Sequence, residues 1–142
     1  MTANTKPLDE GLAVCSFVSP EDLPRLAREF RTIINNRPDA EEPGQPTSAD
    51  IEQAARRLGL EYVHIPVVPG QISDDQVAAF GKALGEKPGP VLAFCKTGTR
   101  AASLWALSRA SEHGGDQVLA AAKQAGFDLQ GLKPRLEATA NS

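Results

Sequence analysis

The 142-residue chain is poor in cysteine, in histidine and in continuous apolar sequence. Its only two cysteines, Cys15 and Cys95, exclude a framework of several disulfides. The N-terminus lacks the charged-then-apolar pattern of an export signal, so we expect a cytoplasmic protein with reduced thiols. His64 has no companion His or Cys at ligand spacing and His113 is expected at the surface, so we expect no metal. We expect no cofactor either.

Nucleic acid and membranes are not expected as partners. The net charge of −3 provides no basic surface for nucleic acid, and no apolar run approaches the length of a membrane span. A hydrophobic content of 41% with 23% charged residues is typical of an ordinary globular domain. At this length we expect a single domain over residues 1–142, with residues 1–8 and 139–142 frayed.

Short apolar segments alternate with helical patterns along the first two thirds of the chain. Strands are predicted at 12–16, 31–36, 61–68 and 90–94, with helices at 20–30, 48–58 and 73–84. Beyond residue 100 the pattern is purely helical, to about 111, then to 126, and more weakly over 132–138. This order predicts an α/β fold: about four mostly parallel strands flanked by helices, with an all-helical C-terminal third.

The most informative segment is the loop between the strand at 90–94 and the helix that follows. Cys95 opens this loop and Arg100 closes it; the residues between them are Lys96, Thr97, Gly98 and Thr99. Backbone N–H groups and the positive end of the helix dipole make such a loop a site for an anion. A thiol beside this site and beside an arginine favours the thiolate form. We therefore predict that Cys95 is a nucleophile, that Arg100 binds the anionic substrate, and that the four intervening residues form the anion-binding loop.

Two further candidates follow strands and are expected at the same rim of the sheet, where ligands of parallel sheets bind. Arg37 comes directly after the strand at 31–36; it either lines the pocket or pairs with the acidic residues at 39–42. Cys15 lies at the end of the first strand. It is either a plain core cysteine or a second thiol that resolves an oxidised Cys95.

A strand followed by Cys, a glycine-containing loop and an Arg that opens a helix resembles the protein tyrosine phosphatase and rhodanese superfamilies. More closely, the chain is similar to the bacterial beta-lactamase hydrolase-like family and its phosphatase-like domain. The matching segments are residues 33–39 with Glu41 or Glu42, residues 59–67, and residues 90–105. Several segments in the right order are more specific than the loop alone. The resemblance implies a phosphatase-like α/β fold and, in sulfide-oxidation contexts, sulfur transfer.

The loop from Cys95 to Arg100, here termed the active loop, departs from the tyrosine phosphatase pattern in several ways. That pattern has five residues between Cys and Arg, whereas four separate Cys95 from Arg100. A shorter loop offers fewer N–H donors to a phosphoryl group, and its six residues resemble the rhodanese loop, which holds a persulfide. The related phosphatases have an Asp general acid where residues 67–70 offer none, and Phe94 and Ala101 replace their usual His and hydroxyl residue.

These departures favour a sulfurtransferase. Cys95 would take sulfane sulfur from a persulfide or thiosulfate donor, form a persulfide and pass the sulfur to a thiol acceptor. The expected partners are a small-molecule sulfur donor or oxyanion substrate and, by resemblance, a persulfide dioxygenase or another sulfur-oxidation protein. The alternative is a small tyrosine or dual-specificity-type phosphatase that works through a phospho-Cys95 intermediate. A third interpretation is a non-enzymatic module that binds an anion or a persulfide.

Overall fold

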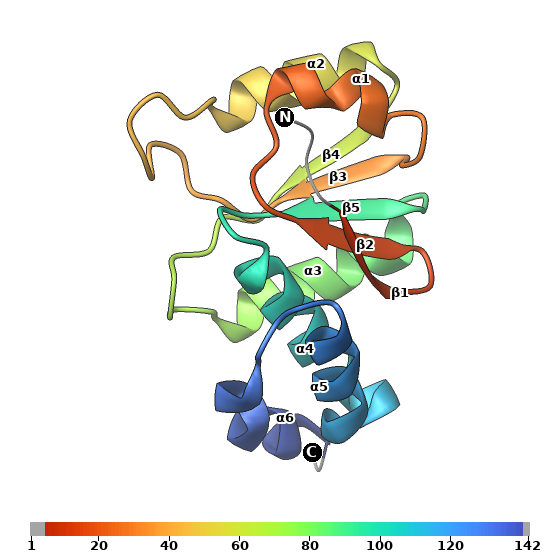
Figure 1. Cartoon of the computed structure of the whole chain (residues 1–142), viewed down its shortest axis with the longest axis vertical. Helices are drawn as coiled ribbons and strands as arrows, with labels where there is room; N and C mark the ends of the chain where they lie inside the picture. Colours follow the sequence, from red (N-terminus) through yellow and green to blue (C-terminus); the bar gives the residue numbers. More distant parts are fainter. Residues whose placement is uncertain (1–4, 141–142) are drawn as a thin grey trace.

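The structure, a computed structural model, describes residues 5–140 and places a β-sheet between two layers of helices (Figure 1). The strands are β1 (Lys6–Asp9), β2 (Leu12–Cys15), β3 (Thr32–Asn35), β4 (Glu61–His64) and β5 (Val91–Phe94). They lie in the order β1-β2-β5-β3-β4. All neighbours are parallel except β1, which pairs antiparallel with β2 at the edge. The predicted α/β class with a mostly parallel sheet is confirmed.

Helices cover both faces of this sheet. They are the turn η1 (Pro20–Asp22), α1 (Leu23–Leu26), α2 (Ser48–Arg57), α3 (Asp74–Glu86), α4 (Thr99–His113), α5 (Gly115–Gln124), the turn η2 (Gln130–Leu132) and α6 (Lys133–Ala140). In Figure 1, α1 and α2 lie on one face and α3 and α4 on the other, each pair over its own apolar core. No helix within residues 5–140 has both the length and the apolar character needed to cross a membrane.

α4 is the most deeply buried helix of the molecule. Its side chains at Leu104, Ala106 and Ala110 are completely inaccessible, and Leu107 is only 3% exposed. This burial arises because α4 packs against α3 on one side and against α5 and α6 on the other. A helix with apolar residues on more than one face buries them by packing against neighbours on more than one side. The predicted all-helical C-terminal third is therefore a further layer that covers α4.

Some residues near each end that were expected to be frayed lie in regular elements. Residues 6–8, expected to be frayed, belong to β1. Only Leu8 among them is buried, so the strand shows no alternation of apolar and polar residues. Its pairing with β2 holds it in place. Residues 139–140, also expected to be frayed, belong to α6. The other residues of that expectation, 1–4 and 141–142, lie outside the described residues.

Two predicted elements are shorter in the structure. The helix predicted at 20–30 is reduced to η1 and α1, since the backbone N–H groups of Arg28 and Glu29 bond three residues back and the α-helical pattern ends. The strand predicted at 61–68 ends at His64, and Pro66 has no N–H group with which to continue the ladder.

Candidate active site

The segments that follow the parallel strands converge at one edge of the sheet. β2 and β3 flank β5 in register, so that Cys15 and Asn35 both lie opposite Phe94. Arg100, which follows β5, bonds to a glutamate from the loop after β3 and to a carbonyl group from the segment after β4. The sheet therefore brings together the loops that the sequence placed at one rim.

The sulfur of Cys95 lies at the base of the active loop. Cys95 directly follows β5 and is fully buried, and its Sγ accepts a hydrogen bond from the backbone N–H of Gly98 at 3.0 Å. Gly98 is the N-cap of α4, so an N–H group at the start of this helix points at the sulfur. The anion site predicted from the sequence needs N–H groups placed in this way, and its role in binding an anion stays a prediction.

Glycine is required at position 98 for two reasons. Its φ of +92° is unfavourable for residues with a side chain. A Cβ atom here would lie 3.0 Å from Cζ of Phe127 and 3.3 Å from the carbonyl oxygen of Cys15. Phe127 lies between α5 and η2, so the C-terminal layer directly contacts the active loop.

The other loop residues are exposed at its mouth. The Thr97 hydroxyl donates to the Thr99 hydroxyl at 3.1 Å. The ammonium group of Lys96 pairs with a carboxylate oxygen of Glu42 at 2.6 Å. The loop thus has a buried floor at Cys95 and a polar rim.

Arg100 is buried and firmly oriented. Its Nη1 and Nη2 donate to the two carboxylate oxygens of Glu41 at 2.7 and 2.9 Å, and Nη1 also donates to the carbonyl of Val67 at 2.7 Å. A guanidinium has five N–H groups. Two of these, the Nε–H and one Nη2–H, donate to no partner among the described residues, so one edge of the fork remains available for an oxyanion.

Arg37 combines the two roles considered for it. Its Nε donates to Glu41 at 2.9 Å and its Nη2 lies 3.3 Å from Glu42, while the residue also lines a pocket beside the loop. Its backbone is fixed as well: the N–H donates to the side chain of Asn35 at 2.8 Å, and the carbonyl accepts from Nε2 of His64 at 2.9 Å.

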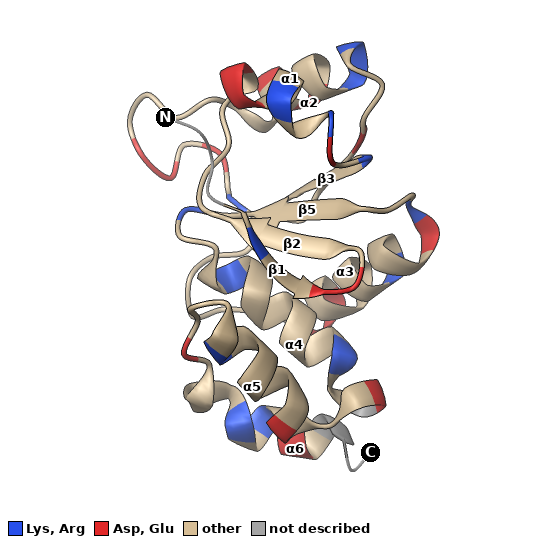
Figure 2. Ribbon diagram, turned by 45° about the vertical axis from the view of Figure 1, so that its right-hand side comes forward, with Lys and Arg blue, Asp and Glu red and all other residues tan. Residues whose placement is uncertain are grey.

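Charges of both signs gather at this end of the sheet. Figure 2 shows acidic positions of the loop between β3 and α2 at the same end of the sheet as basic positions of the segments that follow β3 and β5. The hydrogen bond from Arg100 holds the pKa of the Glu41 carboxyl below its ordinary value, and that from Lys96 lowers the pKa of Glu42. Both groups are therefore ionised at neutral pH, and neither is poised to donate a proton.

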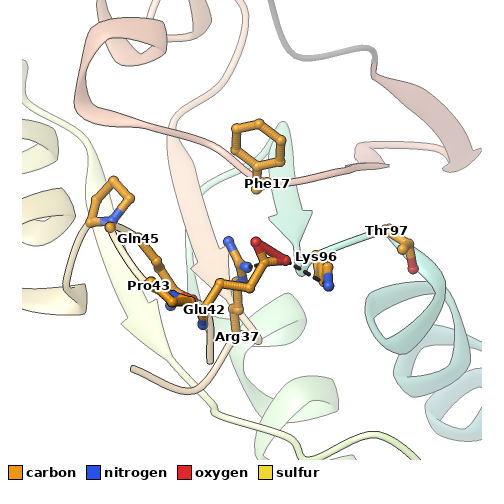
Figure 3. Close-up of a pocket in the computed structure, with 9 residues that line it drawn as sticks. Phe17, Arg37, Glu42, Pro43, Gln45, Lys96 and Thr97 are labelled. Carbon is orange, nitrogen blue, oxygen red and sulfur yellow. Dashed lines mark hydrogen bonds and ion pairs between the residues drawn. The ribbon is translucent and has the colours of Figure 1, made fainter. Parts of the chain in front are cut away.

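A pocket of about 330 Å³ opens beside the active loop (Figure 3). Lys96 and Thr97 line it on the loop side, and Arg37 and Glu42 line it from the segment after β3. Phe17 lies across the pocket from them in Figure 3 and is 54% exposed. The pocket thus combines charged groups with an apolar wall.

Cys15 lies in the core and not among the residues that line this pocket. Its side chain belongs to the apolar cluster under α1, with Val18, Leu23 and Phe94. Burial, together with the nearby charge of Cys95, raises the pKa of the Cys15 thiol to about 12. At neutral pH this thiol is therefore not a ready nucleophile, and it is its backbone carbonyl that approaches the active loop.

Three features of the site were not found from the sequence. Glu41 was considered only as a partner of Arg37, yet it also binds Arg100. The need of a buried arginine for a carboxylate is a signal that could have pointed to it. Phe17 and Phe127 carry no local signal of their proximity to the loop.

The five-stranded, mostly parallel sheet with helices on both faces is an α/β domain with a fold like that of protein tyrosine phosphatases. A family model described as "Beta-lactamase hydrolase-like protein, phosphatase-like domain" matches residues 4–112. The chain belongs to this family, as the resemblance predicted. The beta-lactamase hydrolase-like protein of Xylella fastidiosa is 40% identical over 125 residues, which cover 86% of this chain and 29% of that protein. The chain thus spans less than a third of the length of this curated relative.

Solved structures share the fold. A candidate phosphatase from Neisseria meningitidis has a TM-score of 0.84 and 36% identity, with 94% of this chain and 96% of that chain covered. Tk-PTP in its active form has a TM-score of 0.74 at 17% identity over 96% of this chain and 95% of its own, a likeness of fold. These comparisons fit the phosphatase alternative better than sulfur transfer, for which they give no support.

Proposed function

We propose that the protein is a phosphatase that hydrolyses phosphate monoesters through a phospho-Cys95 intermediate. The observation that carries this proposal is the N–H group of Gly98 directed at the Cys95 sulfur, 3.0 Å away, at the start of a helix. Such a group is placed to bind an oxygen of a phosphoryl group held at that sulfur. The similarity to the Neisseria candidate phosphatase over nearly the whole chain supports the same class of reaction.

The chemistry takes two steps. The Cys95 thiolate attacks phosphorus, and the S–P bond forms as the P–O bond to the leaving group breaks. Loop N–H groups and the open edge of Arg100 bind the non-bridging oxygens as charge develops on them. Water then attacks the phosphocysteine, which releases inorganic phosphate and restores the thiolate.

Neither carboxyl group that contacts the cations of the described site is poised to protonate the leaving oxygen. Glu41 and Glu42 contact the cations of the site, and these cationic partners keep both carboxyl groups ionised. The leaving group therefore takes its proton from water, and this favours substrates whose leaving group is a weak base, such as a phenolate.

Steady-state turnover of p-nitrophenyl phosphate tests the proposal. Cys95→Ser should lose at least about a thousandfold in kcat, and Arg100→Lys about a hundredfold in kcat/KM because it loses the planar fork. Vanadate should inhibit the wild type. Cys15→Ala, which removes the other thiol, serves as the control and should retain turnover. Turnover that persists in Cys95→Ser would contradict the proposal.

Sulfur transfer is the second candidate, and the length of the active loop favours it. In this case the Cys95 thiolate attacks the outer sulfur of a persulfide, the donor thiolate leaves, and an acceptor thiol then removes the sulfur from Cys95. A departing thiolate needs no proton, which also agrees with the ionised state of Glu41 and Glu42. A persulfide dioxygenase or another sulfur-oxidation protein would then be the partner.

A further inference from the structure

Two cations line the pocket beside the active loop and have no part in the two steps above. The Arg37 side chain is only 7% exposed, and its position is fixed from β3 and β4 through its backbone hydrogen bonds. Lys96 comes from the active loop itself and directly follows Cys95. One cation is therefore rigid and the other adjoins the nucleophile.

The carboxylate of Glu42 bridges these two cations. Its Oε1 lies 2.6 Å from Nζ of Lys96 and 3.3 Å from Nη2 of Arg37, and Figure 3 shows its side chain between them. The Glu42 carboxylate thus shows that Arg37 and Lys96 can bind the same oxyanion.

Glu42 is held less firmly than its neighbour Glu41. The Glu41 side chain is 16% exposed and bonds to both Arg100 and Arg37, including a two-point contact with Arg100. The Glu42 side chain is 42% exposed and uses one oxygen for both of its ion pairs. Exposed ion pairs contribute little to stability, so a ligand can displace Glu42 at small cost.

We propose that Arg37 and Lys96 form a second anion subsite, which takes a carboxylate or phosphate group on the organic part of the substrate once Glu42 moves aside. The inference rests on the proposed function, which places the reacting phosphate at Cys95. The pocket of about 330 Å³, with Phe17 as its apolar wall, holds the organic part between the two anions. The substrate class is a phosphate monoester that carries a second anionic group.

Charge balance agrees with this assignment. Three cations, Arg37, Lys96 and Arg100, share the site with the carboxylates of Glu41 and Glu42. When Glu42 turns toward solvent, the three cations face a single internal carboxylate. The Cys95 thiolate of the proposed mechanism offsets one further cation, and the positive charge that remains favours a ligand with an added anionic group.

Calorimetric binding of two matched phosphonates tests the subsite. Benzylphosphonate carries one anionic group, and 4-carboxybenzylphosphonate adds a second. Glu42→Gln should strengthen binding of the carboxylated compound about fivefold to tenfold more than that of benzylphosphonate, because the competing carboxylate is gone. Lys96→Gln should abolish any preference for the carboxylated compound. Glu112→Gln removes an equal charge at the exposed end of α4 and should behave as the wild type.

The outcomes separate this inference from the proposed function. If Glu42→Gln changes the affinity for both phosphonates equally, or weakens both, Glu42 does not occupy a subsite and the inference is wrong. If benzylphosphonate binds but the added carboxylate has no effect in any variant, the inference fails while the proposed function stands. If neither compound binds to any variant, the loop at Cys95 is not an oxyanion site and the proposed function fails with it.

Discussion

At the scale of single residues, the guanidinium of Arg100 is fixed along one edge and open along the other. Glu41 takes the edge formed by Nη1 and Nη2, and the Val67 carbonyl takes the remaining Nη1–H. A planar donor that is already oriented loses little freedom when it binds an oxyanion. We therefore expect Glu41 to act as a positioning residue through Arg100.

Replacing Glu41 with Gln keeps the shape of the side chain but removes the charge that orients Arg100. We expect kcat/KM for an aryl phosphate to fall about tenfold to a hundredfold, since a small displacement of a catalytic group has effects of this size. Vanadate inhibition should weaken in parallel, with Glu112→Gln as the charge control. If Glu41 instead competed with the substrate for Arg100, vanadate would bind more tightly to the variant.

The same substitution should change how stability depends on pH. The hydrogen bond from Arg100 lowers the pKa of Glu41 in the folded protein below its ordinary value of 4.5. The carboxylate therefore stabilises the fold above that pH, and its contribution is lost as the pH falls through the lowered pKa. Urea unfolding at about pH 7 should find the wild type more stable than Glu41→Gln, and the difference should shrink at about pH 3. A constant difference would contradict this assignment.

At the scale of elements, those with local signals were predictable. The start of α3 is an example, because Ser73 and Gln76 form a capping box that is visible in the sequence. The loop from Cys95 to Arg100 is another, since an apolar strand, a glycine and a helical pattern follow one another directly. The edge strand β1 could not be predicted, because it is held by pairing and not by its own apolar pattern.

The long-range contacts of the site could not be predicted from the sequence either. Glu41 reaches Arg100 across 59 positions of the chain, and only the packing of the sheet brings the two together. Phe127 approaches Gly98 from the C-terminal layer. No local pattern specifies either contact. The loop from Cys95 to Arg100 could therefore be located from the sequence, but not the groups that orient Arg100.

The start of α4, where the active loop meets Phe127, is sensitive to one added methyl group. Gly98→Ala should lose about 2–4 kcal/mol, about 1 for the backbone at positive φ and about 1–3 for the crowded Cβ. Gly126→Ala is the matched control: its φ is +99° and its Cβ would meet nothing within 4 Å, so it should lose only about 1 kcal/mol. Urea unfolding measures both. Equal losses would mean that the contact with Phe127 has no energetic effect.

At the scale of the whole molecule, the sheet and the C-terminal layer share α4. The helix is buried from both sides, and Leu136 of α6 is completely inaccessible above it. The family model ends at residue 112, before α5 begins. The packing therefore predicts that the C-terminal layer unfolds together with the sheet, and Phe127 of this layer also contacts the active loop.

Removal of residues 115–142 should therefore destabilise the sheet domain. It exposes the outer face of α4, and each large apolar side chain left uncovered costs about 1.5–3 kcal/mol. We expect the shortened chain to unfold at lower urea or to lose its cooperative transition. The milder Leu136→Ala should lose about 2–5 kcal/mol through the cavity it leaves. Unchanged unfolding in both variants would show that the C-terminal layer is an independent addition.

The central claim is that Cys95 carries a phosphoryl group during turnover, and acid quenching with intact-mass measurement tests it most directly. The wild type is mixed with an aryl phosphate in one sample and with glutathione persulfide in another, with Cys95→Ser beside each. We predict a gain of one phosphoryl group that requires Cys95 and disappears once the substrate is consumed. No phosphoryl gain, together with a one-sulfur gain at Cys95 that an acceptor thiol removes, would contradict the account and establish sulfur transfer instead.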